Sequence, residues 1–297
     1  MVGCGAMGAA AGWRLAERGA EVVCFDRHSP PHALGSSHGE TRITRTAYFE
    51  GAWYVPLLLE TFPMWRALEK ATGAELLTVT GLLTLGALDS PPIVGALAAA
   101  REHRQPTQVL DAPEARRLYP AHVVDDHDVV VVDPQAGFVR PEAAIVAMLQ
   151  QLDVRRDQPV GAITPTGEGV DVTTAAGRES FDAVVVAAGT WARELLPFLP
   201  VTVERQVTVW LEIEPHAEQF APERFPVYFR ETTALGDIYG FPTLDGRTVK
   251  LARHHGGETT DPHRIRREVD DADLDPLRTF ATQIGRASCR ERVCVPV

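Results

Sequence analysis

The pattern of apolar and polar positions at the start of the chain predicts a strand, a glycine-rich turn, a helix and a second strand. Met1 and Val2 form the end of the first strand, and the helix is predicted over residues 9–18. An apolar run over residues 21–26 predicts the second strand, which ends in a carboxylate. Helical spacing predicts further helices over residues 54–71, 92–103, 112–119, 141–152 and 262–283.

Strand patterns differ between the two halves of the chain. Short apolar or alternating runs predict strands over residues 78–86, 129–132, 170–174 and 181–188. Beyond residue 200, alternating runs with Gly/Asp turns between them predict strands over residues 205–212, 226–230, 237–241 and 248–253. Such alternation is typical of an antiparallel sheet that packs on one face.

Together, these elements predict an α/β fold with two interleaved domains. A doubly wound, Rossmann-like nucleotide-binding domain is predicted over residues 1–77 and 134–200. A substrate domain on a mainly antiparallel sheet is predicted over residues 78–133 and 201–283. The second sheet is expected to cover the bound nucleotide.

The first turn has the Gly-x-Gly-x-x-Gly spacing of a dinucleotide site. Gly3 allows a tight turn, Gly5 allows close approach of a pyrophosphate, and Gly8 allows the helix to pack on the strand. The amides at the helix N-terminus favour phosphate, and Asp26 is placed to accept ribose hydroxyls. A βαβ unit without a ligand is the alternative. The predicted contacts in this unit are Gly3, Gly5, Ala6, Met7, Gly8, Asp26 and Arg27.

Composition and charge argue against several classes of function. The 297 residues are 45% hydrophobic and 23% charged, and the net charge of −11 argues against a nucleic-acid or anionic-membrane surface. No apolar run approaches the ~18 residues of a membrane span, so a cytoplasmic protein is expected. The spacing of the four cysteines (Cys4, Cys24, Cys289 and Cys294) predicts neither a metal site nor a disulfide.

Two further stretches carry candidate chemistry. The loop over residues 35–45 is rich in glycine and hydroxyl groups, and it brings His38, Arg42 and Arg45 close to the nucleotide turn. A solvated surface pair is the alternative interpretation of the two arginines. A second turn that follows a predicted strand, residues 187–191, fits another edge of the nucleotide.

These stretches resemble the flavin-dependent amine oxidases typified by monomeric sarcosine oxidase and N-methyltryptophan oxidase. The resemblance runs from Gly3 to about residue 280. It is carried most specifically by the loop Gly-Ser-Ser-His-Gly-Glu-Thr-Arg-Ile-Thr-Arg at residues 35–45, with agreement also at residues 184–191, 205–206, 238–242 and 249–254. It implies FAD as cofactor, a small amine or amino-acid substrate, and oxidation of a secondary (N-methyl) amino acid with O2, giving H2O2. A monomer is expected.

The resemblance also implies roles for individual residues. Arg45 would bind the substrate carboxylate, whereas Arg42 and Lys250 would lie beside the flavin ring. The residues implied on the substrate side are His38, Tyr239 and His254. The residues implied to contact the cofactor, beyond the first turn, are Ser36, His38, Thr41, Arg42, Val160, Ala188, Gly189 and Trp191.

The chain departs from the family at several positions. The family usually has a second histidine in place of Ser37 and a histidine in place of Thr46, and it often has a tyrosine in place of Glu204. Residues 284–293 match, residue for residue, one reading frame of a common sequencing-library adapter, so residues 284–297 are expected to be a non-native tail. The family's flavin-linking cysteine and a second carboxylate-binding lysine fall beyond residue 283, and the true start is expected upstream of Met1 or at a misassigned Met1.

Three hypotheses therefore stand after the sequence alone. The first is an FAD-dependent amine oxidase of which this chain is an incomplete copy. The second is a related D-amino-acid or glycine oxidase, or an amine dehydrogenase with another electron acceptor. The third is an FAD-binding fragment without turnover.

Overall fold

The N-terminal strand lies in the middle of a small parallel arrangement. The computed structural model describes residues 1–213, 217–232, 234–283 and 288–294, with side chains to Thr282. Val2 forms parallel bridges to Val186 on one side and to Phe25 of β1 (Val23–Phe25) on the other. β1 pairs in parallel with β8 (Asp153–Arg155). Parallel order and a helix after the first turn confirm the predicted doubly wound unit.

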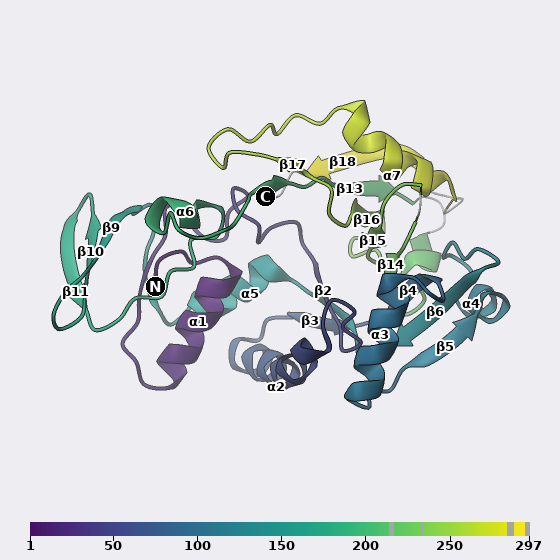
Figure 1. Cartoon of the computed structure of the whole chain (residues 1–297), viewed down its shortest axis with the longest axis horizontal. Coiled ribbons are helices and arrows are strands. Elements are labelled where there is room, and N and C mark those ends of the chain that lie inside the picture. Colours follow the sequence, from purple (N-terminus) through teal and green to yellow (C-terminus); the bar gives the residue numbers. More distant parts are fainter. Residues whose placement is uncertain (214–216, 233, 284–287, 295–297) are drawn as a thin grey trace.

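Three helices pack beside this parallel unit (Figure 1). They are α1 (Ala6–Glu17), α2 (Val55–Thr72) and α5 (Pro141–Leu149). Their buried faces share one apolar cluster, to which α1 contributes Ala9, α2 contributes Leu68 and α5 contributes Ile145. Proline at the first turn of α5 is compatible with helix initiation, since that position needs no backbone donor.

Among the described residues, the largest sheet has eight strands and lies in the other half of the molecule (Figure 1). Its spatial order is β18 (Ser288–Cys294), β13 (Thr208–Glu212), β16 (Thr248–Arg253), β15 (Ile238–Gly240), β14 (Val227–Arg230), β4 (Leu82–Ala87), β6 (Asp128–Asp133) and β5 (Gln108–Asp111). β4 and β14 are parallel, and all other neighbours are antiparallel.

The two faces of the large sheet pack differently because side chains alternate along each strand. On β14, Tyr228 joins the main core, which also contains residues of α4 (Ala112–Leu118) and α7 (Asp271–Gln283). Its neighbours Val227 and Phe229 point to the opposite face, where they pack with Phe241. α3 (Pro91–Glu102) packs against β4 and β6.

Smaller elements connect these two regions. β2 (Arg42–Thr44), β7 (Gly137–Val139) and β3 (Leu77–Val79) form one antiparallel sheet, and β9 (Val160–Pro165), β10 (Val170–Thr174) and β11 (Gly177–Phe181) form another. β12 (Glu204–Arg205) pairs with β17 (Glu258–Thr259). The remaining helical turns are η1 (Ala52–Tyr54), η2 (Gly189–Trp191), α6 (Ala192–Leu195) and η3 (Ala217–Phe220).

Three predicted elements need correction. The strand predicted over 78–86 is two strands in different sheets, because Gly81 turns the chain with φ +77°. The strand predicted over 181–188 is not one strand, because Phe181 ends β11 and pairs with Val170, while Val186 forms a separate parallel bridge to Val2. The helix predicted over 262–283 begins at Asp271, and the preceding segment is irregular.

Buried Arg205 contacts this irregular segment. Its guanidinium donates to the backbone carbonyls of Arg266 (2.6 Å) and Glu268 (2.9 Å), and it pairs with Asp273 (2.7 Å). These contacts tie the irregular segment before α7 to β12. The run 205–212 is also split, into β12 and β13.

The predicted domain boundaries stay a prediction, although the chain visits each region twice. Strands of the large sheet come from residues 82–133 and again from 208 onward, whereas the parallel unit uses residues 1–25 and 153–186. The prediction of a non-native tail falls partly on β18 and otherwise outside the described residues, and it also stays a prediction. Within the described residues, no helix is long and apolar enough to cross a membrane.

We predict that buried His122 makes the fold acid-sensitive. Its ring stacks on Phe225 at 3.9 Å, and burial lowers the pKa of His122 to about 3. An unfolded histidine titrates near 6.5, so below that pH the unfolded chain binds more protons and stability falls. At pH 5 the loss from this residue should be about 2 kcal/mol.

Urea unfolding of wild type and His122→Phe at pH 7 and pH 5 measures this loss. The variant should lose less stability between the two pH values, whereas a control variant of an exposed histidine, His127→Gln, should behave as wild type. Equal losses in wild type and His122→Phe would contradict the assignment.

Candidate functional site

A cleft opens at the carboxyl end of the parallel strands, where the N-terminus of α1 points into it. It is lined by Val2, Gly3, Gly5, Ala6, Met7, Phe25, Asp26, Arg27, Pro30, Pro31, His32, Gly35, Ser36, Ser37, Ile145, Val160, Ala187, Ala188, Gly189, Thr190, Trp191 and Leu195. The first turn, the end of β1 and the second glycine turn therefore meet around one cavity. Ligands of doubly wound folds bind at such a position.

Glycine is required at two positions of the first turn. Gly3 has φ +90°, and a Cβ there would lie 2.4 Å from the carbonyl oxygen of Ala187. A Cβ on Gly8 would lie 1.8 Å from the carbonyl oxygen of Gly3. The turn therefore packs backbone against backbone, which leaves the amides at the start of α1 at the cleft.

Asp26 holds this turn in place. Its carboxylate accepts hydrogen bonds from the amides of Cys4 (2.7 Å) and His28 (2.9 Å), and His32 lies 3.7 Å away. Burial alone would raise the pKa of Asp26, but the hydrogen bonds from His32, His28 and Cys4 lower it. The side chain is thus ionised and oriented at the cleft wall, where the sequence places the ribose contact.

The predicted cofactor residues divide into two groups. Those that line the cleft are Gly3, Gly5, Ala6, Met7, Asp26, Arg27, Ser36, Val160, Ala188, Gly189 and Trp191. Gly8, His38, Thr41 and Arg42 do not line it. Gly8 packs beneath the turn, and the other three lie along residues 36–47, which we call the linking segment.

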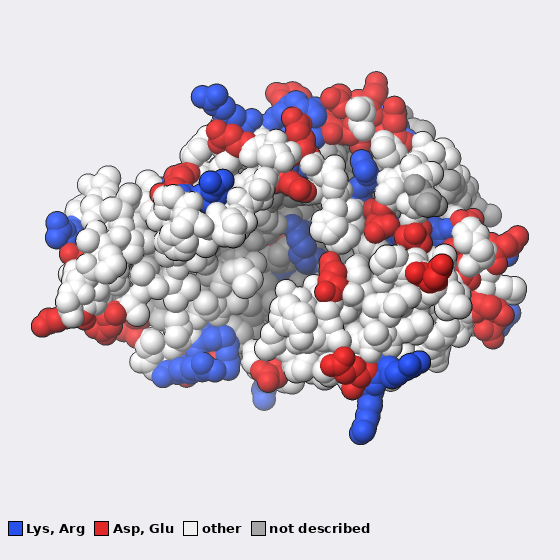
Figure 2. Space-filling view, viewed as in Figure 1, with Lys and Arg blue, Asp and Glu red and all other residues white. Residues whose placement is uncertain are grey.

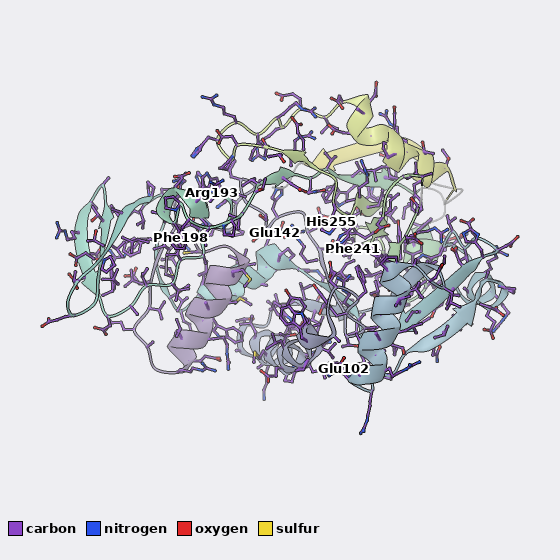
Figure 3. The ribbon with its side chains drawn as sticks, viewed as in Figure 1. Glu102, Glu142, Arg193, Phe198, Phe241 and His255 are labelled. Carbon is purple, nitrogen blue, oxygen red and sulfur yellow. The ribbon has the colours of Figure 1, made fainter. Side chains whose placement is uncertain are left out.

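The linking segment is fixed to the parallel unit at its first residues. The Ser37 hydroxyl accepts a hydrogen bond from the Ala6 amide (3.1 Å) at the start of α1. Glu142 of α5 accepts from the amides of Gly39 (2.6 Å) and Glu40 (3.1 Å). Ser37 and Glu142 were not among the predicted site residues, because no local pattern marks either of them. In Figure 3, Glu142 lies at α5 while Phe241 and His255 lie toward the large sheet.

Two cations hold the middle of the linking segment. Arg42 donates to the carbonyls of Thr41 (2.7 Å), His38 (2.8 Å) and Ser36. Buried Lys250 of β16 donates to the carbonyls of Gly39 (2.5 Å) and Thr41 (3.0 Å). Its ammonium also lies 4.8 Å from the centre of the Phe241 ring. Figure 2 shows the surface hollowed between the two halves, with cationic side chains at the base of the hollow.

Arg45 lies at the far end of the linking segment in an aromatic environment. Its guanidinium carbon is 4.3 Å from the ring centres of both Tyr48 and Phe49. One Nη donates to the carboxylate of Glu50, whereas Nε has no hydrogen-bond partner within the described residues. A guanidinium carries five N–H donors, so a buried arginine with an unpaired Nε can still donate to a second carboxylate.

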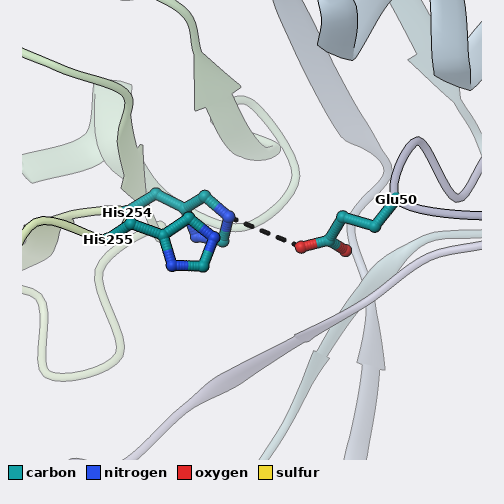
Figure 4. Close-up of side chains that lie close together, drawn as sticks. All are labelled: Glu50, His254 and His255. Atoms are coloured by element: carbon teal, nitrogen blue, oxygen red, sulfur yellow. Dashed lines mark ion pairs between the residues drawn. The ribbon is translucent and has the colours of Figure 1, made fainter. Parts of the chain in front are cut away.

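Glu50 connects Arg45 to His254 (Figure 4). His254 Nε2 lies 3.4 Å from Glu50 Oε1, and the hydrogen bond with His254, with the charge of Arg45, lowers the pKa of Glu50 to about 2. No sequence motif marks Glu50, so it was not among the predicted site residues.

Aromatic rings enclose His254. Phe229 lies 5.0 Å and Tyr239 6.3 Å from its ring centre. Burial raises the pKa of Tyr239, and burial with the charge of Arg42 lowers the pKa of His38. Of the six predicted catalytic residues, His38, Arg42 and Arg45 belong to the linking segment and Lys250 bonds to it, whereas His254 contacts Glu50 just past its end and Tyr239 lies beside His254.

Comparison with known proteins gives one family and consistent relatives. The family described as FAD dependent oxidoreductase (DAO) matches residues 1–287. The chain is 36% identical over 286 residues to the monomeric sarcosine oxidase of Streptomyces avermitilis, covering 93% of this chain and 74% of the relative. It is 36% identical over 263 residues to the N-methyl-L-tryptophan oxidase of Yersinia pestis, covering 87% of this chain and 70% of the relative.

Solved structures share the fold. NikD, described as an unusual amino acid oxidase essential for nikkomycin biosynthesis, superimposes with a TM-score of 0.83 at 24% identity, over 99% of this chain and 80% of NikD. Glycine oxidase from Geobacillus kaustophilus superimposes with a TM-score of 0.76 at 20% identity, over 99% of this chain and 81% of the glycine oxidase.

We predict that Gly3→Ala prevents flavin binding. The new Cβ would clash with backbone atoms of Ala187 and Ala188, which cannot move aside as a flexible side chain can. The positive φ at this position would also be strained for alanine. The matched control is Gly19→Ala, because Gly19 has a similar φ of +87° with nothing within 4 Å of the new Cβ. Flavin content of the purified proteins, from visible absorbance, should fall in the first variant and persist in the second. Equal flavin content in the two variants would contradict the role of the close approach.

Proposed function

The chain belongs to the family of FAD-dependent oxidoreductases, as an amine oxidase of the sarcosine and N-methyltryptophan oxidase type. We propose that it oxidises the C–N bond of an N-methyl amino acid such as sarcosine, with O2 as acceptor. The observation that carries this proposal is the buried Arg45, whose guanidinium holds an internal carboxylate and keeps a spare donor. A carboxylate-bearing small amine is the substrate class that fits it.

The cofactor site fits FAD on the chain's own geometry. Close backbone packing at Gly3 and Gly8 leaves the first turn open to a pyrophosphate. Asp26 offers an oriented carboxylate at the cleft wall. Trp191 and Val160 provide apolar lining at the same cleft. When bound, the flavin accepts the two electrons that leave the amine and passes them to the electron acceptor.

Arg45 positions the substrate by its carboxylate. A planar guanidinium binds a carboxylate through two parallel hydrogen bonds, which sets orientation as well as affinity. Because Glu50 occupies one Nη of Arg45, an incoming substrate must compete with Glu50 for this donor. Tyr48 and Phe49 flank the guanidinium, which is buried.

The remaining polar groups act on charge and protonation. The substrate amine loses a hydride most readily when its nitrogen has a free lone pair, so a site that disfavours the protonated amine assists the reaction. Buried His38, with its lowered pKa, and Tyr239, with its raised pKa, are neutral groups in such a site. Lys250 and Arg42, both held at the linking segment, would stabilise the negative charge that develops during reduction of oxygen.

Anaerobic mixing of the flavin-loaded protein with sarcosine tests the proposed function. The visible flavin absorbance should bleach, return on admission of air, and yield one H2O2 per amine oxidised. Glycine and N-methyltryptophan serve as comparison substrates. Bleaching by glycine but by no N-methyl amino acid would favour a glycine oxidase, and reoxidation without H2O2 would favour a dehydrogenase.

We predict opposite effects of substitutions at the two ends of the Arg45–Glu50 pair. Arg45→Lys removes bidentate geometry, so substrate binding should weaken by about 2–4 kcal/mol and the Kd should rise accordingly. Glu50→Gln keeps the shape of the side chain but removes the competing charge, so the Kd should fall. Rapid-reaction titration of flavin reduction measures both. A Glu50→Gln variant that binds substrate more weakly than wild type would contradict competition at Arg45.

A further inference from the structure

Glu50, His254 and His255 bring three metal-binding side chains to one point. The carboxylate oxygen and the two ring nitrogens that they offer all lie within 4.8 Å of one another. Figure 4 shows the two imidazole rings side by side, facing the carboxylate from a different part of the chain. The sequence alone predicts no metal here, because Glu50 lies far from the two histidines along the chain.

The backbone holds both histidines in this arrangement. β16 ends at Arg253, and the His254 amide donates to the carbonyl of Asp237 (2.7 Å). His255 follows in the left-handed region with φ +66°. This turn places the two ring centres 4.0 Å apart with 52° between their planes.

Glu50 is positioned separately, by the end of the linking segment. The carboxylate of buried Asp133 accepts hydrogen bonds from the amides of Thr46 (2.5 Å) and Ala47 (2.8 Å). Glu50 follows a few residues later and is partly exposed, with 34% of its side chain accessible. A small ion can therefore reach the carboxylate from solvent.

We propose that Glu50, His254 and His255 form a binding site for a divalent cation of the Zn²⁺ class. Two imidazoles and one carboxylate, with water in a fourth position, are a donor set that Zn²⁺ takes in tetrahedral sites. The surrounding charge is mixed. Asp237 interacts electrostatically with both histidines and with Glu231, whereas Arg45 pairs with Glu50 and opposes a cation.

A second cluster serves as a comparison within the same chain. Asp125, His127 and Asp128 also place ligand atoms within 4.8 Å of one another. Both carboxylates there already pair with Arg230, and the cluster contains a single imidazole. The cluster of Glu50, His254 and His255 has two imidazoles and shares one carboxylate with an arginine, so it should bind the cation more tightly.

The proposed consequence is competition between the cation and Arg45 for Glu50. Coordination of Glu50 would weaken its ion pair with Arg45, and the bound ion would sit beside the aromatic site at Arg45. Binding of Zn²⁺ can be measured without any substrate. A failure of the proposed substrate would therefore be distinguishable from a failure of the proposed metal site.

Titration of Zn²⁺ into the flavin-loaded full chain, against a chromophoric chelator, tests this site. Wild type should bind one Zn²⁺ that competes with the chelator. His255→Asn and Glu50→Gln should each weaken this binding by about tenfold or more, at least the loss seen when a metal's outer partners are removed. Asparagine is chosen because it tolerates the left-handed backbone at this position.

The matched control is His127→Asn in the second cluster, which should bind Zn²⁺ as wild type does. Circular dichroism and flavin content show whether each variant is folded. Wild-type Zn²⁺ affinity in both folded His255→Asn and folded Glu50→Gln would overturn the proposal, as would loss of binding in His127→Asn alone. Absence of any Zn²⁺ binding by wild type would overturn it as well.

Discussion

The structure depends on how the linking segment, residues 36–47, is held between two halves of the molecule. Its first residues bond to α1 and α5, through Ser37 and Glu142. Its middle bonds to Lys250 of the large sheet, and its end bonds to Asp133. Each anchor satisfies backbone groups or charges that would be costly to bury alone. The segment therefore has one position relative to both the cleft and Arg45.

This constraint explains why cations can be buried in the hollow. Lys250 is 4% exposed, and burying an ammonium without hydrogen-bond partners is costly. Backbone carbonyls of Gly39 and Thr41 accept hydrogen bonds from it and offset this cost. Positive charge is thus fixed next to the linking segment before any ligand binds, so no reorganisation is needed during reaction.

The sequence predicted the parts of the site that local pattern determines and missed those that depend on distant contacts. The turn at Gly3 and the carboxylate of Asp26 follow from spacing alone, and the structure places both at the cleft. Arg45 and Lys250 were assigned from a family resemblance, and their roles stay a prediction. Glu50 could not be predicted, because no motif marks it and its contact with His254 joins segments about two hundred residues apart in the chain.

Titration of acetate into the flavin-loaded protein tests the central claim that the linking segment couples the carboxylate site to the flavin. Acetate has a carboxylate but no amine, so it can bind at Arg45 without reaction. We expect a saturable change in the visible flavin spectrum, shifted to higher acetate concentration in Arg45→Lys. Equilibrium dialysis measures acetate binding independently of the flavin. Acetate that binds wild type more tightly than Arg45→Lys in dialysis, yet leaves the flavin spectrum unchanged, would contradict this coupling.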